Sequence, residues 1–423
     1  MALPDLILDP LATPGVLAAK ALIRHGSASD PEGLRGAHQL LGSVLSRGCG
    51  PYGPIQLADL VEGCGAGLRC DTHEDGLLIS LKCRDVDAER LLPVIGWMLR
   101  QPHLRPDQVE LEKELSLQAL LRQKEDAFHL AYDGWRSLAY GSGSYAHDPL
   151  GVAEELKEIS PDQLRCLAAQ LEDHGSVLAL SGTIPTKLLK LMESHEAFQE
   201  GGAQPITLAA STPRGTSLRT EQGTLSIREQ TTEQVVLMLG QPSLAHGHPD
   251  DPGLRLLQAH LGQGMSSLLF RRLREDHGVA YDVGVHHPAR AGAAPFVMHA
   301  ATSTDRSKLS LQLLLESWNE MCSKPLDPDD LQLAKVKVRG QLAHASQTTG
   351  QRAERRAQLR GLGLPDDHDQ RCLEIMDALD PVSIQRIAAE HLRRPLLSLC
   401  GPQASLRALE SQWEARQGEA RQR

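Results

Sequence analysis

One histidine in the segment from Gly36 to Gly42 stands at the start of an incomplete metal-binding pattern. In the pattern H-x-x-E-H, two histidines four residues apart share one helix face and bind zinc, and the glutamate between them activates a water molecule. Here His38 occupies the first histidine position, while Leu41 and Gly42 occupy the positions of the glutamate and the second histidine. Neither of these two residues can bind a metal or transfer a proton. The segment therefore lacks most of the chemistry that its first residue suggests.

Two other segments combine histidine with acidic residues. Residues 246–251 (HGHPDD) and residues 366–369 (DDHD) contain residue types that bind metals. Solvated turns have the same composition, and we favour that interpretation for both segments. His286 and His287 are neighbours in an expected strand, so their side chains point to opposite faces and cannot bind one ion together.

The size and composition of the chain indicate a globular protein with two domains. Its 423 residues exceed what one hydrophobic core usually supports, and its hydrophobic fraction of 41% is ordinary for such proteins. The eight cysteines include no C-x-x-C pair, so we expect reduced and mostly buried thiols. The net charge of −10 argues against a nucleic-acid-binding surface and is compatible with a positively charged peptide partner.

Neither a membrane span nor a targeting segment is expected. No apolar run approaches the roughly 18 residues that suggest a membrane-spanning helix. The first residues, MALPD, show no basic start followed by an apolar stretch and a cleavage site. We therefore expect a cytoplasmic protein without membrane contact.

Three segments of the first half of the chain recur in the second half. Because the three matches occur in the same order at nearly the same offset, 220 to 222 residues, the sequence predicts two homologous halves. The matched pairs are residues 160–169 with 380–389, residues 106–113 with 328–335, and Ala37-His38 with Ala259-His260.

A stretch rich in glycine, proline and polar residues predicts a linker over residues 199–215, between domains at residues 1–198 and 216–423. Both halves repeat one order of elements, with strands clustered in hairpins and separated by helical pairs. This order favours an α+β fold in which each half is a mainly antiparallel sheet packed with helices. The expected strands are residues 17–23, 76–83, 177–182, 234–240, 294–301 and 396–401, and expected helices include residues 34–46 and 253–262.

Several of these segments resemble the pitrilysin/insulinase family of metallopeptidases, which includes the mitochondrial processing peptidases. The resemblance extends over nearly the whole chain, and its most specific block lies in the second half. It implies two homologous halves that face each other across a chamber, with zinc on one side. It rests on Gly26-Ser27, Asp30-Pro31, Gly36-Ala37-His38 and residues 145–151 (YAHDPLG) in the first half, and on residues 262–270 (GQGMSSLLF) and 273–281 (LREDHGVAY) in the second.

The resemblance implies that the first half has no working zinc site. The third zinc ligand of the family is a glutamate on a later helix, and the matching position falls on Leu120 or Leu121, depending on the alignment. Of the four catalytic groups only His38 remains, and one histidine cannot supply the three protein ligands of a hydrolytic zinc. We therefore expect no metal in this chain and a His38 that packs or hydrogen-bonds at a helix start. A weak metal contact at His38 is the alternative.

The second half retains a pair of residues that could bind a substrate. Arg274 and Tyr281 match the arginine/tyrosine pair that family members place opposite the zinc. A guanidinium and a phenol can stabilise the negative oxygen of a tetrahedral intermediate through preorganised hydrogen bonds. The alternative is an arginine that caps its helix and a tyrosine that packs on the sheet. The turn with Gly262, Gly264 and Ser266 could contact a peptide backbone.

These observations lead to a hypothesis of divided labour between two subunits. The chain would be a non-catalytic, substrate-binding subunit that supplies Arg274 and Tyr281, while a homologous partner supplies the zinc, the H-x-x-E-H pattern and the glutamate. The expected assembly is a heterodimer that hydrolyses a peptide substrate. Two alternatives stay open: an inert structural or binding homologue without a role in proteolysis, and an independent peptidase with an unrecognised metal site.

Overall fold

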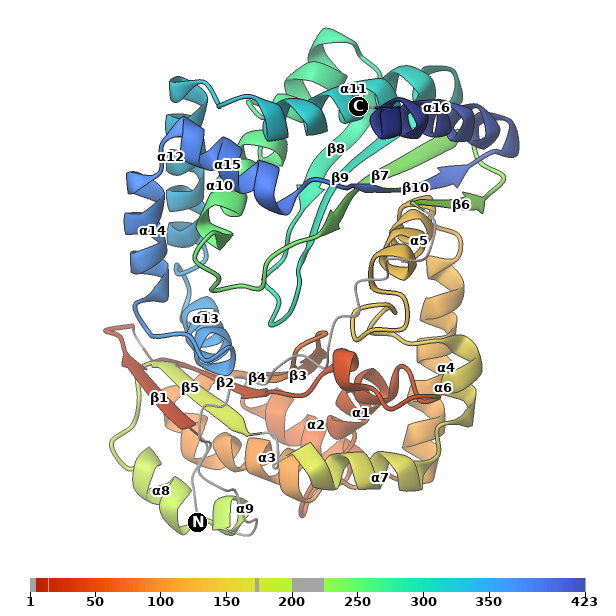
Figure 1. The fold of residues 1–423 in the computed structure, drawn as a ribbon. Coiled ribbons are helices and arrows are strands. Elements are labelled where there is room, and N and C mark those ends of the chain that lie inside the picture. The colour runs from red at the N-terminus through yellow and green to blue at the C-terminus, as the bar shows by residue number, and fades with distance from the viewer. Residues whose placement is uncertain (1–4, 14, 172–174, 200–223, 423) are drawn as a thin grey trace. The chain divides into compact units, whose positions relative to one another are not determined.

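The computed structural model describes residues 5–13, 15–171, 175–199 and 224–422 (Figure 1). The chain divides into two compact units, and each unit is assembled from three segments. The linker that we predicted over residues 199–215 lies outside the described residues, apart from its first residue. Unit 1 consists of residues 1–121, 147–212 and 343–368, and unit 2 consists of residues 122–146, 213–342 and 369–423.

Unit 1 contains a five-stranded sheet in the order β1-β5-β2-β4-β3. The outer strand β1 is parallel to β5, and all other neighbouring strands are antiparallel. The strands are β1 (Asp5–Pro10), β2 (Val16–Ile23), β3 (Gly67–Thr72), β4 (Leu77–Arg84) and β5 (Ser176–Gly182). The helices are α1 (Ala37–Leu45), α2 (Pro54–Gly63), α3 (Ala88–Arg100), α4 (Pro106–Gln123), α6 (Ala153–Glu158), α7 (Pro161–Gln170), α8 (Leu188–Ser194), α9 (Glu196–Gln199) and α13 (Thr349–Gly361).

Unit 2 contains a second five-stranded sheet, in the order β6-β10-β7-β9-β8. Its strands are β6 (Leu225–Glu229), β7 (Gln234–Pro242), β8 (Ala280–His286), β9 (Pro295–Ser303) and β10 (Leu396–Gly401). Its helices are α5 (Ala127–Tyr140), α10 (Asp251–Gly262), the π-helix η4 (Phe270–Asp276), α11 (Ser307–Ser323), α12 (Pro328–His344), α14 (His368–Ala378), α15 (Pro381–His391) and α16 (Gln403–Gln422).

The two sheets confirm the predicted α+β fold with two homologous halves. If the strands of each sheet are numbered from its first strand, both sheets have the order 1-5-2-4-3. The six predicted strands and both predicted helices are present. One detail of the predicted repeat is wrong: His38 is the second residue of α1, whereas His260 lies two residues before the end of α10. The dipeptides Ala37-His38 and Ala259-His260 therefore occupy opposite ends of corresponding helices.

Each unit includes one helix from the other half of the sequence, which the repeat alone did not predict. Helix α13 packs on β2 and β5 in unit 1, and α5 packs on β10 and β7 in unit 2. Small side chains permit a close approach in unit 1, because Ala353 and Ala357 of α13 are fully buried against Ala18 and Ala179 of the sheet. In unit 2 the indole of Trp135 in α5 is buried and donates a hydrogen bond to the carbonyl of Gly240 (3.1 Å).

The cysteines and the apolar content of the helices agree with the sequence analysis. All eight cysteines are free thiols, and burial raises the pKa of the Cys322 thiol to about 11. In the part of the chain that the structure describes, no helix is both long and apolar enough to cross a bilayer. The cytoplasmic location stays a prediction.

A buried ion pair fastens α13 to the sheet of unit 1. Lys20 lies in the central strand β2, and its ammonium donates hydrogen bonds to Ser80 Oγ (2.8 Å) and Glu354 Oε2 (2.7 Å). The lysine side chain is buried, whereas that of Glu354 is partly exposed. A buried ammonium is costly unless a carboxylate compensates it, so the position of α13 determines whether a lysine is tolerated in this strand.

Replacement of Glu354 by leucine should lower the free energy of unfolding by about 2 kcal/mol, because it leaves the ammonium of Lys20 buried without its carboxylate. The double variant Lys20→Met/Glu354→Leu should recover most of that loss, since no charge is then buried. Urea unfolding followed by circular dichroism measures both changes. Equal losses in the single and double variants would show that the ion pair does not stabilise this packing.

Candidate functional site

A buried aspartate holds the start of helix α1. The carboxylate of Asp30 accepts hydrogen bonds from the backbone N–H groups of Gly36 (2.6 Å) and His38 (3.0 Å). It also accepts bonds from the ring nitrogens His38 Nδ1 (2.7 Å) and His147 Nε2 (3.2 Å). Burial by itself raises the pKa of Asp30, but the hydrogen bonds from His147 and His38 outweigh it and hold the pKa below its usual value. The carboxylate is therefore ionised at neutral pH, at the positive end of the helix.

The second ring nitrogen of His38 is also occupied. His38 Nε2 lies 2.6 Å from Nδ1 of His25, and the two rings meet edge to face with their centroids 4.5 Å apart. The side chains of His38 and Asp30 are completely buried. His38 is thus a hydrogen-bonded histidine at a helix start, and neither of its nitrogens is available to a metal in this arrangement.

The remaining positions of the zinc pattern are closed as well. Leu41 is fully buried in the core of unit 1. A Cβ atom on Gly42 would lie 2.6 Å from Thr72 Oγ1 and 3.6 Å from Cys70 Sγ, so strand β3 fills the space of a side chain at this position. At the third ligand position, Leu120 is buried and Leu121 is 63% exposed, and neither offers a donor atom. The residues present do not fit a zinc ion.

Arg274 and Tyr281 are brought together by the turn between η4 and β8. Gly278 adopts a φ of 58° in this turn, which reverses the chain direction. One guanidinium nitrogen of Arg274 donates a hydrogen bond to the backbone carbonyl of Tyr281 (3.1 Å), and the guanidinium lies over the ring of Phe270 at 4.9 Å. Arg306 holds the turn by donating to the carbonyl of Gly278 (3.2 Å).

Both side chains keep hydrogen-bonding capacity that the protein does not use. Arg274 is exposed, and within the described ranges its one hydrogen bond is the bond to the Tyr281 carbonyl. Tyr281 is 47% exposed, and its hydroxyl has no partner among the described residues. Burial and the neighbouring Asp282 raise the pKa of Tyr281, so the phenol is protonated at neutral pH. The pair therefore presents a fixed guanidinium and a neutral phenol to a ligand.

The turn with Gly262, Gly264 and Ser266 lies between α10 and η4. Gly262 permits close packing, because a Cβ atom there would lie 2.5 Å from the backbone nitrogen of Val285 in β8. Gly264 and Ser266 are exposed, and the ammonium of Lys337 donates to the carbonyl of Gln263 (2.8 Å). Contact between this turn and a peptide stays a prediction.

Residues 247–249 form an exposed turn, as the sequence indicated, but His246 and Asp251 at the two ends of this segment belong to a buried network that the sequence did not predict. Asp251 begins α10 inside the unit, and its Oδ2 lies 2.7 Å from His246 Nδ1 and 2.9 Å from Arg255 Nε. His287 Nε2 lies 3.4 Å from Oδ1 of the same carboxylate. Burial raises the pKa of Asp251, but hydrogen bonds from His246 and His287 outweigh it and lower the pKa far below the usual range. Composition did not reveal this burial, which depends on where α10 packs.

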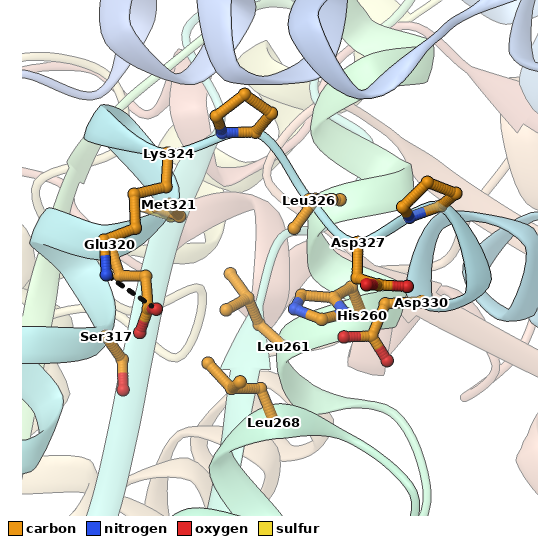
Figure 2. A pocket seen from close by; sticks show the side chains of 12 residues that line it. His260, Leu261, Leu268, Ser317, Glu320, Met321, Lys324, Leu326, Asp327 and Asp330 are labelled. Carbon is orange, nitrogen blue, oxygen red and sulfur yellow. Dashed lines mark hydrogen bonds and ion pairs between the residues drawn. The ribbon is translucent and has the colours of Figure 1, made fainter.

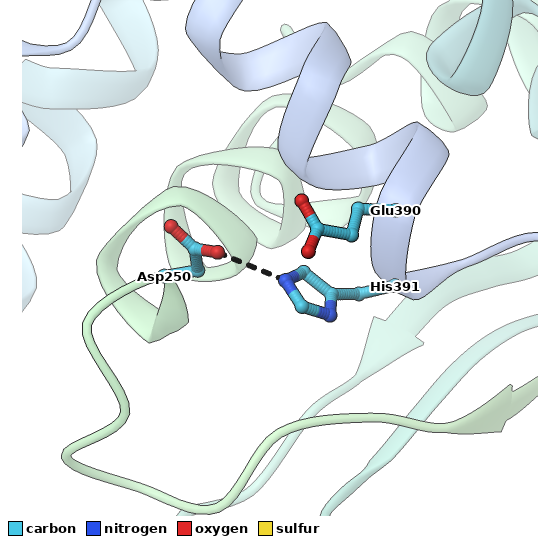
Figure 3. Close-up of side chains that lie close together, drawn as sticks. All are labelled: Asp250, Glu390 and His391. Carbon is cyan, nitrogen blue, oxygen red and sulfur yellow. Dashed lines mark hydrogen bonds and ion pairs between the residues drawn. The ribbon is translucent and has the colours of Figure 1, made fainter.

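Another cluster combines metal-binding residue types. Among the described residues, the ligand atoms of Asp250, Glu390 and His391 lie within 4.8 Å of one another (Figure 3). His391 Nε2 is 2.9 Å from Asp250 Oδ2, and Arg386 pairs with Glu390 (2.9 Å) and Asp250 (3.5 Å). Because Arg386 pairs with both carboxylates and His391 contacts Asp250, this cluster is accounted for as a surface ion-pair network.

Comparisons with known proteins agree on one group. Residues 159–338 match the family model described as the peptidase M16 inactive domain. The chain is 22% identical over 384 residues to an uncharacterized zinc protease of Streptomyces coelicolor, over 89% of this chain and 83% of the relative. It is 23% identical over 371 residues to the non-peptidase homolog YmxG of Helicobacter pylori, over 86% of this chain and 82% of the relative. A solved peptidase M16 inactive domain from Pseudomonas fluorescens has a TM-score of 0.82 at 20% identity, over 94% of this chain and 95% of that chain.

The double substitution Leu41→Glu/Gly42→His should not create a zinc site, although it restores the H-x-x-E-H pattern in the sequence. Thr72 fills the space at Gly42, Leu41 is buried in the core, and the third ligand is still absent. We expect no zinc in the purified variant by elemental analysis and a lower melting temperature. Stoichiometric zinc bound without loss of stability would contradict the closed geometry described above.

Replacement of Asp30 by asparagine should lower the free energy of unfolding at pH 7 by about 2–3 kcal/mol, because charge-assisted bonds to two histidines and two backbone N–H groups are lost. The pKa of Asp30 is lowered by folding. Its contribution is therefore fully present above the usual aspartate pKa of about 4 and is lost as the pH falls through the folded-state value. Urea unfolding between pH 7 and pH 3 should show a shallower acid loss in the variant. The matched control is Asp59→Asn on the exposed face of α2, and an equal effect of both substitutions would contradict this role.

Proposed function

Because the chain belongs to the M16 peptidase family as a member of its inactive type, we propose that it is the non-catalytic, substrate-binding subunit of a heteromeric zinc peptidase. A homologous partner with an intact H-x-x-E-H pattern would hold the zinc and activate the water. This chain would contribute Arg274 and Tyr281 to peptide hydrolysis at the partner's metal, and it would bind no metal itself.

The proposal rests on a contrast between the residues at the degenerate zinc pattern, which are buried and hydrogen-bonded, and the Arg274/Tyr281 pair, which is exposed. At the start of α1, both nitrogens of His38 and the carboxylate of Asp30 form a closed hydrogen-bond network. On η4 and β8, Arg274 and Tyr281 are exposed side chains with unused donors. Burial of the first set contributes to stability, whereas exposed donors contribute little to it. The Arg274 guanidinium is held by the Tyr281 carbonyl and the Phe270 ring, and its other donors are free to bind a ligand.

The fixed geometry of Arg274 suits stabilisation of a developing negative charge. Its guanidinium is planar and permanently charged, and stacking on Phe270 together with the bond to the Tyr281 carbonyl limits its movement. A donor that is held in place before the reaction costs no reorganisation when the oxyanion forms. The phenol of Tyr281 would provide a second, neutral donor. Gly264 and Ser266, which are exposed and precede Arg274 in the sequence, would bind the main chain of the peptide.

The partner must be a different polypeptide under this proposal. Two copies of this chain would together hold two closed Asp30 networks and no complete set of zinc ligands. A zinc ion lowers the pKa of bound water from 15.7 to about 7, and a dimer without zinc would have no such nucleophile. The expected assembly is therefore a heterodimer.

Peptide cleavage by the purified chain together with a homologous zinc-motif subunit tests the proposal. We expect cleavage by the mixture and none by this chain alone. Arg274→Ala should lower kcat/KM by about 10²- to 10³-fold, in the range of lost oxyanion donors. Tyr281→Phe should lower it less, because the substitution removes the hydroxyl and leaves the backbone carbonyl that orients Arg274. The control is Arg339→Ala, which removes another exposed arginine of unit 2 that pairs with Asp377.

The same assay separates the alternatives. Full activity of the complex with both Arg274→Ala and Tyr281→Phe would contradict a shared site and would favour an inert structural or binding homologue. Cleavage by the chain alone would instead indicate an unrecognised catalytic site. The zinc content of the partner, measured in each complex, shows whether a loss of activity comes from a loss of metal.

A further inference from the structure

A cavity of about 450 Å³ lies in unit 2 between the end of α10 and the loop that joins α11 to α12. Apolar side chains from four different segments line it: Leu261 of α10, Leu268 before η4, Met321 of α11 and Leu326 of the loop. Figure 2 shows these side chains around the cavity, with polar groups at two of its sides. Its volume and its mixed lining are typical of sites for small ligands or single side chains.

The most unusual group in this cavity is the imidazole of His260. Only 7% of this residue is exposed, and it lines the cavity from the last turn of α10. No hydrogen bond or ion pair joins its ring to any residue that the structure describes. Burial lowers the pKa of His260, so the ring is neutral at pH 7 and has one bare nitrogen that accepts hydrogen bonds. The ring therefore faces the cavity with hydrogen-bonding capacity that the described residues do not use and that a ligand could complete.

Two carboxylates share the cavity wall with His260. Asp327 accepts a hydrogen bond from the backbone N–H of Asp329 (2.9 Å) and has no ion-pair partner within the described ranges. Asp330 has a single long contact with a cation, at 3.4 Å from Arg271. Figure 2 shows both carboxylates on the same side of the cavity as His260. This side therefore offers three acceptors.

The other charged groups of the lining are already satisfied. The carboxylate of Glu320 pairs with Arg272 (2.7 Å) and with Lys324 (3.4 Å) on the other side of the cavity. These pairs leave no free cation in the described lining to attract an anionic ligand. An anion would also face the charges of Asp327 and Asp330, which oppose its binding.

We propose that this cavity binds a primary ammonium group carried on an apolar stem. An ammonium has three donors and no acceptor, which matches the bare nitrogen of His260 and the carboxylates of Asp327 and Asp330. The stem would pack on Leu261 and Leu268. A lysine side chain of a peptide and a free alkylamine share this chemistry. The site does not depend on the proposed role of Arg274 and Tyr281.

Calorimetric titration of the full chain with pentylamine, pentanol and valerate at pH 7.5 and low salt tests this proposal. The three probes have the same stem and differ in the head group. We expect saturable binding of pentylamine and at least about tenfold weaker binding of pentanol and valerate, since only the ammonium satisfies all three acceptors. Equal binding of pentylamine and pentanol, or no saturable binding of pentylamine, would overturn the proposal.

Three substitutions assign the binding to this cavity. Asp330→Asn removes one acceptor oxygen at nearly constant volume, and His260→Phe removes the ring nitrogens and keeps an aromatic ring. Asp327→Asn removes the charge and preserves the hydrogen bond at the start of α12, because asparagine caps helices as well as aspartate does. Each should weaken pentylamine binding about tenfold or more. The control is Glu316→Gln, an exposed carboxylate of α11 that accepts a hydrogen bond from Gln312 and does not line the cavity. Wild-type affinity in all three cavity variants would refute the site.

A measurement on the unaltered protein covers the case in which a cavity variant folds poorly. Pentylamine should shift the imidazole NMR signals of His260 until they saturate, and pentanol should not. Signals of His260 that do not respond to pentylamine would contradict the proposal. Titration with Nα-acetyl-lysine amide then distinguishes the two sources: binding that matches pentylamine supports a peptide side chain, and binding of pentylamine alone supports a free amine.

Discussion

The ionised carboxylate of Asp30 is the constraint on which the first half of this protein depends. It is completely buried, and a buried charge persists only where donors surround it. Four donors do so: two backbone N–H groups at the start of α1 and the rings of His38 and His147. These bonds fix where α1 begins and orient His38 toward His25. His38, which suggests metal binding in the sequence, therefore helps to stabilise the negative charge of Asp30.

Unit 2 contains a similar arrangement at the helix that corresponds to α1. Asp251 begins α10, is buried, and is surrounded by His246, His287 and Arg255. In both units a low pKa of the aspartate follows from the donors around it and opposes the effect of burial. Clusters of histidine and aspartate that resemble metal ligands in the sequence are thus structural in both units. The chemistry of this protein must be sought where polar groups lack protein partners.

Two such places are present in unit 2, and they differ in the kind of ligand that they favour. Arg274 and Tyr281 offer donors, so they suit a negative or carbonyl oxygen. The cavity at His260 offers acceptors, so it suits a cation. Both depend on η4 and its neighbours: the turn at Gly278 brings Arg274 to Tyr281, and Arg271 of the same π-helix contacts Asp330. The sequence pointed to Arg274 and Tyr281 because the surrounding block resembles a known family. No pattern in the residues around His260 indicated a binding site.

The sequence by itself determined what depends on residue identity and on short-range pattern. Short apolar segments predicted strands such as residues 17–23, which the structure extends to Val16–Ile23. The repeated segments predicted two similar halves, and the presence of Leu41 and Gly42 excluded a complete zinc site. Only the tertiary structure decided what depends on residues far apart in the chain. It placed α13 on the sheet of unit 1, His147 on Asp30 and the loop at Asp327 over His260. Hydrogen bonds and burial arise from three-dimensional neighbours, and a local pattern carries no information about which distant residue completes them.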